Sequence, residues 1–151
     1  MMEIVPIENY KEMIAEAWSS DQPLYEKYHY CAGEGLDRCI EDTISRLSMC
    51  KDLEFFKVTL GGADFGFFAT EYFRFGSFLT TFFIFPEYRS KENGKKFISL
   101  IRKYCGTDKC LFTAIFDNND RAANFLERNG FDIIEIGVEG HRQYYVYKYE
   151  K

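Results

Sequence analysis

The stretch FFIFPEYRSKENGKKF, residues 82–97, joins the end of an apolar run to a polar loop and the start of a helical pattern. The apolar run stops at Pro86, which cannot donate a hydrogen bond to a sheet ladder. The helical pattern begins at Gly94. The first N–H groups of a helix have no partner inside the helix, so a buried strand that leads through a loop into a helix can bind an anion. The sequence therefore predicts that the functional site of the protein is an anion site within residues 82–97.

The charges of this loop support an anion site. Arg89, Lys91, Lys95 and Lys96 lie close together in a chain whose net charge is −5. Such a cluster is usually a solvated surface loop. If Asn93 caps the helix, however, Lys95 and Lys96 lie in its first turn, where the helix dipole disfavours cations by roughly 0.3–1 kcal/mol each. A bound anion would offset that cost.

Apolar periodicity predicts the elements on both sides of this stretch. Strands are expected at 3–7, 55–60, 65–72, 77–85, 110–116, 131–136 and 144–149, and helices at 10–18, 34–49, 94–105 and between Asp120 and Gly130. Residues 19–35 show no clear period, which leaves a loop and short helices as alternatives. Since the chain has no linker, repeat or low-complexity segment, residues 1–151 are expected to form one α+β domain.

Composition excludes several classes of protein. The acidic balance argues against duplex nucleic acid as a partner, and no apolar run is long enough to span a membrane or act as a leader. The five cysteines are odd in number and form no C-x-x-C pair. They are expected to be reduced thiols in a cytoplasmic protein, with neither a disulfide framework nor a metal site. An aromatic share of 19% predicts a ring-rich core.

The order strand, PEYRSKENGKK, helix, strand, NNDRAANFLERNGF, strand resembles the Gcn5-related N-acetyltransferase (GNAT) superfamily. In that family an R/Q-x-x-G-x-G/A loop binds the pyrophosphate of acetyl-CoA, and an Asn precedes a short helix that ends in a Gly-aromatic pair. Arg89 and Gly94 match the loop, with Glu92 at its first Gly position. The second motif is matched by Asn119, Ala122, Phe125, Gly130 and Phe131. The resemblance implies a three-layer α+β (α/β) fold, with a mixed, splayed, mostly antiparallel sheet of about 6–7 strands and about 4 helices.

The resemblance also implies acetyl-CoA as cosubstrate. It assigns cofactor binding to the strand residues Phe83, Ile84 and Phe85, to the loop residues Arg89, Ser90, Lys91, Glu92, Asn93, Gly94 and Lys95, and to Asn119 and Phe125. Glycine suits a backbone that approaches a ligand or adopts a positive φ, so Glu92 at such a position is expected to weaken cofactor binding. Asn93 tolerates left-handed geometry and is expected to take up part of the turn.

Direct transfer to an amine needs a base, donors for the oxyanion and often an acid for the thiolate. In many members of the family the acid is a Tyr at the position of Leu126 in this chain. The candidates that remain are Glu71 as base and Tyr88 as a catalytic tyrosine. A strand-edge Glu is more often solvated, and a Tyr in a ring-rich core is more often structural. Further candidates are Tyr104, Glu87, His29 and His141.

The function expected from these motifs is N-acetyl transfer from acetyl-CoA to a small-molecule or protein amine. The alternative is a catalytically degenerate GNAT-like protein that has a binding or structural role, for example in phage particles. This alternative is suggested by Glu92 and Leu126, which depart from the two motifs of the family. A third hypothesis makes the Tyr-rich segment Tyr25–Tyr30 a partner surface. No nucleic-acid or membrane partner is expected, and the sequence is compatible with a homodimer.

Overall fold

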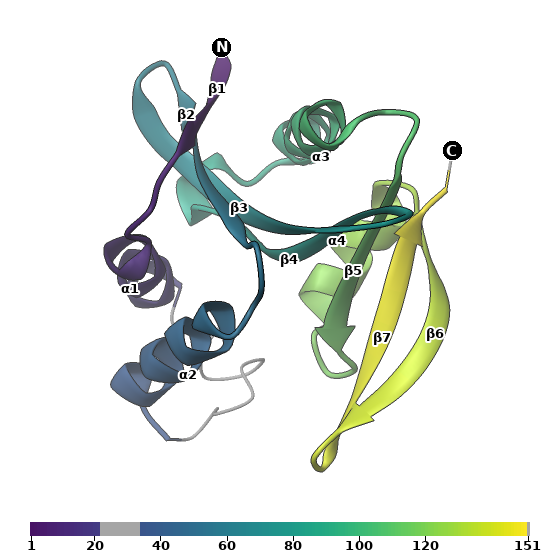
Figure 1. Ribbon diagram of the computed structural model, residues 1–151. Coiled ribbons are helices and arrows are strands. Elements are labelled where there is room, and N and C mark those ends of the chain that lie inside the picture. Colours follow the sequence, from purple (N-terminus) through teal and green to yellow (C-terminus); the bar gives the residue numbers. More distant parts are fainter. Residues whose placement is uncertain (22–33, 151) are drawn as a thin grey trace.

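The computed structural model describes residues 1–21 and 34–150. Seven strands and four α-helices form within these residues (Figure 1). Their order is β1 (Met2–Pro6), α1 (Lys11–Ser20), α2 (Leu36–Ser48), β2 (Glu54–Leu60), β3 (Ala63–Phe73), β4 (Gly76–Ile84), the 3-10 turn η2 (Pro86–Tyr88), α3 (Lys91–Cys105), β5 (Cys110–Phe116), α4 (Asp120–Arg128), β6 (Phe131–Glu139) and β7 (Arg142–Tyr149). His29 and the segment Tyr25–Tyr30 lie outside the described residues.

All seven strands form one sheet in the order β1-β2-β3-β4-β5-β7-β6. Every neighbouring pair is antiparallel except β4 and β5, which run parallel. The parallel pairing covers only four residue pairs and ends where Leu79 lies beside Thr113. Beyond that point β5 follows β7 and β4 follows β3, so the sheet splits into two arms. The expectation of a mixed, splayed, mostly antiparallel sheet is confirmed.

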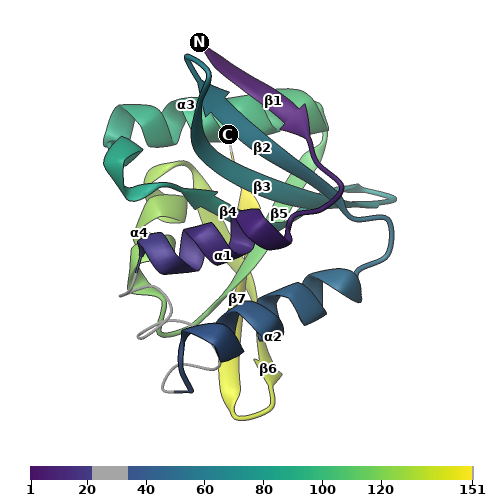
Figure 2. The ribbon, with the colours of Figure 1, turned by 90° about the vertical axis from the view of Figure 1, so that its left-hand side faces the viewer.

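Helices cover both faces of the sheet. Figure 2 looks onto the face that carries α1 and α2, while α3 lies behind the sheet. Each face has its own apolar core, because side chains along a strand alternate between the two faces. The core under α1 and α2 includes Met13, Ile14, Leu47, Phe55, Phe67, Phe83 and Phe85. The core under α3 and α4 includes Phe56, Phe68, Leu79, Phe97, Ile101, Leu126 and Phe131.

A bulge interrupts the ladder between β3 and β4. Ala69 pairs with Thr81 and Thr70 pairs with Leu79, so Thr80 is the extra residue on β4. A bulge locally bends its strand and re-aims side chains. The bulge falls where β4 parts from β5, at the start of the split between the two arms.

None of the helices in the described ranges is long and apolar enough to cross a membrane.

Candidate active site

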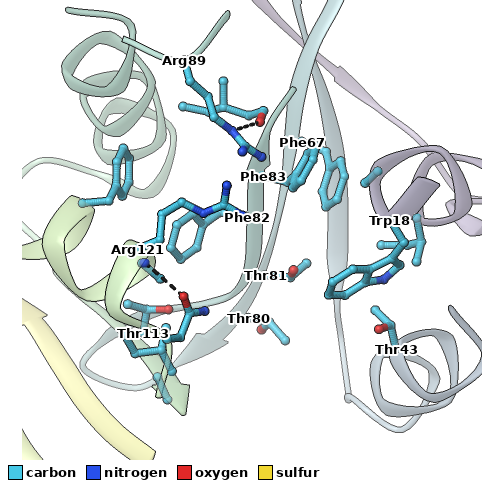
Figure 3. A pocket seen from close by; sticks show the side chains of 18 of the residues that line it. Trp18, Thr43, Phe67, Thr80, Thr81, Phe82, Phe83, Arg89, Thr113 and Arg121 are labelled. Carbon is cyan, nitrogen blue, oxygen red and sulfur yellow. Dashed lines mark hydrogen bonds between the residues drawn. The ribbon is translucent and has the colours of Figure 1, made fainter. Parts of the chain in front are cut away.

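A cavity of about 470 Å³ occupies the split between β4 and β5 (Figure 3). Both walls come from the diverging strands: Thr80 to Ile84 from β4 and Thr113 to Ile115 from β5. The remaining lining residues come from α1, α2 and β3 on one side and from the start of α3 and α4 on the other: Ile14, Ala17, Trp18, Thr43, Phe67, Arg89, Ser90, Lys91, Asn119, Arg121, Ala122, Phe125 and Arg128. The split of the sheet therefore creates the cavity, and the helices close its sides.

One end of the cavity is basic. Arg89, Lys91, Arg121 and Arg128 all line it, although the chain as a whole is acidic. Arg89 is fixed in place, because its Nε donates to the backbone oxygen of Ile84 at 2.8 Å. Its guanidinium also lies over the Phe83 ring, 5.0 Å from the centroid. Burial lowers the pKa of the Arg89 guanidinium, but arginine remains charged at any physiological pH.

A buried carboxylate joins two of these arginines. Asp21, only 4% exposed, lies at the end of α1. Its Oδ2 is 2.6 Å from Nη1 of Arg89 and 2.9 Å from Nη2 of Arg121. The side chain of Asp21 therefore holds the loop before α3 and the first turn of α4 at a fixed separation. Two arginines and one carboxylate leave a net positive charge at this end of the cavity.

Helix α3 begins three residues earlier than the sequence pattern predicts. Its cap is Ser90, whose Oγ accepts from the backbone N–H of Asn93 at 3.0 Å, so the predicted start at Gly94 and the predicted cap Asn93 are wrong. Asn93 is helical, and its Nδ2 donates to the backbone oxygen of Tyr88 at 2.7 Å. The apolar periodicity used to predict the helix did not extend to its first turn, because residues 91–93 are polar and none of them is buried. The amides of Lys91 and Glu92 are first-turn N–H groups without an intrahelical acceptor.

The early start of α3 changes the role of Glu92. It lies in the first turn of the helix, where the dipole favours a carboxylate, and its Oε1 is 3.1 Å from Nζ of Lys96. Among the described non-glycine residues, only Asp52 has a positive φ, so neither Glu92 nor Asn93 is left-handed. The expectation that Asn93 takes up part of a left-handed turn is wrong. Lys95 and Lys96 lie in the second turn of α3, not the first.

Gly94 matters for packing rather than for backbone conformation. A Cβ at Gly94 would lie 2.9 Å from Cε1 of Phe125 on α4, closer than side chains normally approach. Phe125 in turn stacks on Phe82 of β4, with the ring centroids 5.7 Å apart. The glycine lets the start of α3 approach α4 across the cavity. The two sequence motifs thus meet through the Gly94–Phe125 contact.

Seven of the twelve residues assigned to cofactor binding line the cavity: Phe83, Ile84, Arg89, Ser90, Lys91, Asn119 and Phe125. Asn119 caps α4, with its Oδ1 accepting from the N–H of Ala122 at 3.1 Å. The other five, Phe85, Glu92, Asn93, Gly94 and Lys95, are not among its lining residues. Phe85 points into the core under α1 and α2, where it packs edge-on against Phe83.

The two candidate catalytic residues lie in different surroundings. Glu71 on β3 is half-buried, and its Oε1 accepts from the hydroxyl of Thr80 at 2.8 Å. Thr80 lines the cavity, so Glu71 lies directly behind the cavity wall. Tyr88 instead packs against Phe65, with the centroids 5.5 Å apart, and is not a lining residue. Neither side chain lines the cavity, but Glu71 is connected to it by its hydrogen bond from the lining residue Thr80.

Of the other acid and base candidates that the structure describes, Tyr104, Glu87 and His141 do not line the cavity. Leu126 is 0% exposed and points into the core, so the position of the family's tyrosine faces inward in this chain. Tyr104 packs on Phe56 and donates to a carboxylate oxygen of Glu54 at 3.3 Å, while His141 is exposed at the β6–β7 turn. The described residues hold no group of His, Cys, Asp and Glu that could bind a metal ion.

Sequence reasoning missed several residues of the cavity: Trp18, Thr43, Thr80, Thr81, Arg121 and Arg128 line it, and Asp21 braces it. Thr80 and Thr81 carried a usable signal, because they are the two polar residues inside an apolar stretch of β4. The others come from α1, α2 and α4, and nothing in the local sequence distinguishes them from ordinary helix residues.

The new position of Glu92 leads to a testable prediction. Glu92→Gly is expected to lower the free energy of unfolding by about 1 kcal/mol, because glycine is a poor helix former in the first turns of α3. Glu92→Gln keeps the helix propensity and is expected to stay within about 0.5 kcal/mol of the parent. Urea unfolding followed by circular dichroism measures both values. A stabilised Glu92→Gly protein would contradict the helical assignment of this residue.

Comparisons with known proteins support the fold. No family model matches the sequence, and a comparison with curated proteins finds no match either. Among solved structures, a PaiA N-acetyltransferase from Thermoplasma acidophilum in complex with coenzyme A superposes with a TM-score of 0.71 at 16% identity, covering 100% of this chain and 99% of that one.

Two further structures hold a second bound molecule besides coenzyme A. Spermidine N-acetyltransferase from Vibrio cholerae, in complex with CoA and spermine, has a TM-score of 0.66 at 14% identity over 97% of this chain and 94% of that one. AAC(6')-Ib, in complex with ribostamycin and coenzyme A, has a TM-score of 0.72 at 13% identity over 98% and 92%. Together with the splayed seven-stranded sheet, these similarities show that the chain has the fold of the GNAT acetyltransferases.

Proposed function

We propose that the protein is an acyltransferase of the GNAT superfamily, which binds acetyl-CoA in the split of the sheet and transfers the acetyl group to an amine. The observation that carries this proposal is the basic end of the cavity. There Arg89 and Arg121 share the carboxylate of Asp21, and Ser90 and Lys91 at the start of α3 line the same cavity. Converging guanidinium groups and unpaired helix amides are the groups that bind phosphates.

The residues present fit this cosubstrate along the whole cavity. Arg89, Arg121 and the amides of Lys91 and Glu92 would hold the pyrophosphate. The backbone of Phe83 and Ile84 would pair with the amide-containing arm, because β4 has lost its partner strand on that side. Bound in this way, acetyl-CoA supplies an activated thioester. Its acyl end would lie away from the basic end, toward Thr80 and Thr81.

Glu71 is the base that we assign to this transfer. The amine nitrogen forms a bond to the acetyl carbonyl carbon, and the carbon–sulfur bond breaks with its electron pair going to sulfur. The proton of the nitrogen passes to the Thr80 hydroxyl while that hydroxyl passes its own proton to Glu71, along the hydrogen bond of 2.8 Å. The carboxylate is therefore reached through Thr80, since Thr80 lines the cavity and Glu71 lies behind it.

A second candidate function is binding without turnover. It is favoured by the buried Leu126, which leaves no tyrosine at the position of the usual acid. Steady release of CoA thiol in the presence of an amine would exclude this candidate. Tight CoA binding without thiol release from any amine would favour it.

CoA and acetyl-CoA are expected to raise the melting temperature of the protein. A ligand at a concentration of 100 times its Kd stabilises the native state by about 2.7 kcal/mol, which corresponds to roughly 5–10 °C for a chain of this size. Differential scanning fluorimetry with near-millimolar ligand measures the shift, and inorganic pyrophosphate at the same concentration serves as control. If neither CoA nor acetyl-CoA shifts the transition more than pyrophosphate does, the proposal fails.

A further inference from the structure

The cavity has a second end with a different chemistry. Trp18 on α1, Thr43 on α2, and Thr80 and Thr81 on β4 line it, and Figure 3 shows the indole of Trp18 across from the two threonines of β4. Phe67 and Phe83, stacked with their centroids 5.4 Å apart, lie between this end and Arg89. This end therefore offers flat apolar surfaces and hydroxyl groups.

The charged side chains that line the cavity, among the described residues, all carry a positive charge. Among the described residues that line it there are four cations and neither Asp nor Glu. At the second end the carboxylate of Glu71 lies behind Thr80, whose hydroxyl donates a hydrogen bond to it. Asp21 is neutralised by Arg89 and Arg121 at the other end. The second end can thus pair one ammonium group with Glu71 through Thr80. Among the residues that the structure describes, it offers no further carboxylate for a second or third ammonium group of the same ligand.

We propose that the acceptor is a primary monoamine with a flat apolar body, rather than a polyamine or an aminoglycoside. This inference rests on the proposed acetyl transfer and names its substrate class. The body packs against the indole of Trp18, and the amine donates to the hydroxyl oxygen of Thr80, whose own hydrogen bond leads to Glu71. Each additional ammonium of a polyamine would lose water without gaining a carboxylate from the described lining of the cavity, which is costly in a confined site.

Trp18 also supplies the readout, because it is the only tryptophan of the chain. Its emission can be excited selectively at the red edge of the absorption band, where tyrosine does not absorb. Phenethylamine, a monoamine with one phenyl ring, is the probe, and spermine is the comparison. With saturating CoA present, phenethylamine is expected to change the Trp18 emission saturably, whereas spermine at the same concentration leaves it unchanged.

Kinetics with acetyl-CoA provide the second measurement. The kcat/KM for phenethylamine is expected to exceed that for spermine by at least about tenfold. Trp18→Phe keeps a flat ring and is expected to retain most of this rate, while Trp18→Ala is expected to lose roughly tenfold or more. The stabilisation by CoA, measured by melting in both variants, shows whether the fold and the cofactor end remain intact.

The outcomes separate this inference from the proposed function. If CoA stabilises the protein but phenethylamine neither perturbs Trp18 nor supports thiol release, the acceptor class is wrong and the cofactor site stands. Faster turnover of spermine than of phenethylamine would overturn the acceptor class in the same way. If CoA itself fails to bind, the proposed function fails.

Discussion

Gly66→Ala is expected to lower the free energy of unfolding by about 3 kcal/mol, a large fraction of the stability of an ordinary domain. A Cβ at Gly66 of β3 would lie 2.1 Å from the backbone oxygen of Phe83 and 3.1 Å from the Cα of Ile84. Both atoms belong to the backbone of β4, so no side-chain rotation can relieve the clash. The strands must move apart, and this displaces the wall of the cavity that Phe83 and Ile84 form.

Gly137→Ala on β6 is the matched control for this substitution. Its Cβ would lie 2.2 Å from Cζ of Tyr144, but that atom is the far end of a half-buried side chain that can turn aside. The change is therefore expected to cost less than about 1 kcal/mol. Guanidinium chloride unfolding, followed by far-ultraviolet circular dichroism, compares the two variants. Equal losses in both would show that β3 and β4 are not in such close contact at Gly66.

Arg89→Ala is expected to weaken CoA binding roughly tenfold to hundredfold, since hydrogen bonds to charged groups contribute about 1.5–3 kcal/mol each. The Arg89 side chain lines the basic end of the cavity, where Ile84 and Asp21 fix it in position. Arg89→Lys keeps the charge but loses the fork of donors and is expected to fall between the parent and the alanine variant. Isothermal titration calorimetry gives the affinities.

Two controls make this experiment specific. Lys96→Ala removes a nearby cation that pairs with Glu92 and does not line the cavity, so it is expected to leave the CoA affinity within about a factor of two. Pantetheine lacks phosphates, and its weaker binding is expected to be insensitive to Arg89→Ala. If Arg89→Ala binds CoA as the parent does, or weakens pantetheine equally, Arg89 does not hold the phosphates.

Most of the fold could be predicted from the sequence, because it is encoded in local patterns. Alternating or continuous apolar runs predicted all seven strands, and a spacing of three and four residues predicted the four helices. The same argument failed at the start of α3, where the first turn carries no apolar residue and only the Ser90 cap marks it. Periodicity reports burial, so it misses helical turns that are solvated.

The site was predicted only in part. The residues that were predicted lie close together along the chain in short motifs, and those that were missed come from distant segments. The loop from Arg89 to Lys91 and the cap Asn119 could be found because each belongs to a short motif. Trp18 and Thr43 contribute to the same cavity from α1 and α2, and no motif links them to that loop. Glu71 was a weak candidate among many carboxylates until its hydrogen bond from Thr80 placed it behind the cavity wall.

By itself, then, the sequence determined the strands and helices, their order, and the position of a basic loop at a helix start, since these depend on residues that are neighbours along the chain. Only the tertiary structure decided which residues from distant parts of the chain contact this loop. Asp21 and Arg121 are 100 positions apart, yet they share a hydrogen bond at 2.9 Å, and Asp21 also braces Arg89. The inward orientation of Leu126 was likewise decided by packing, because a leucine would be tolerated locally on either face of α4.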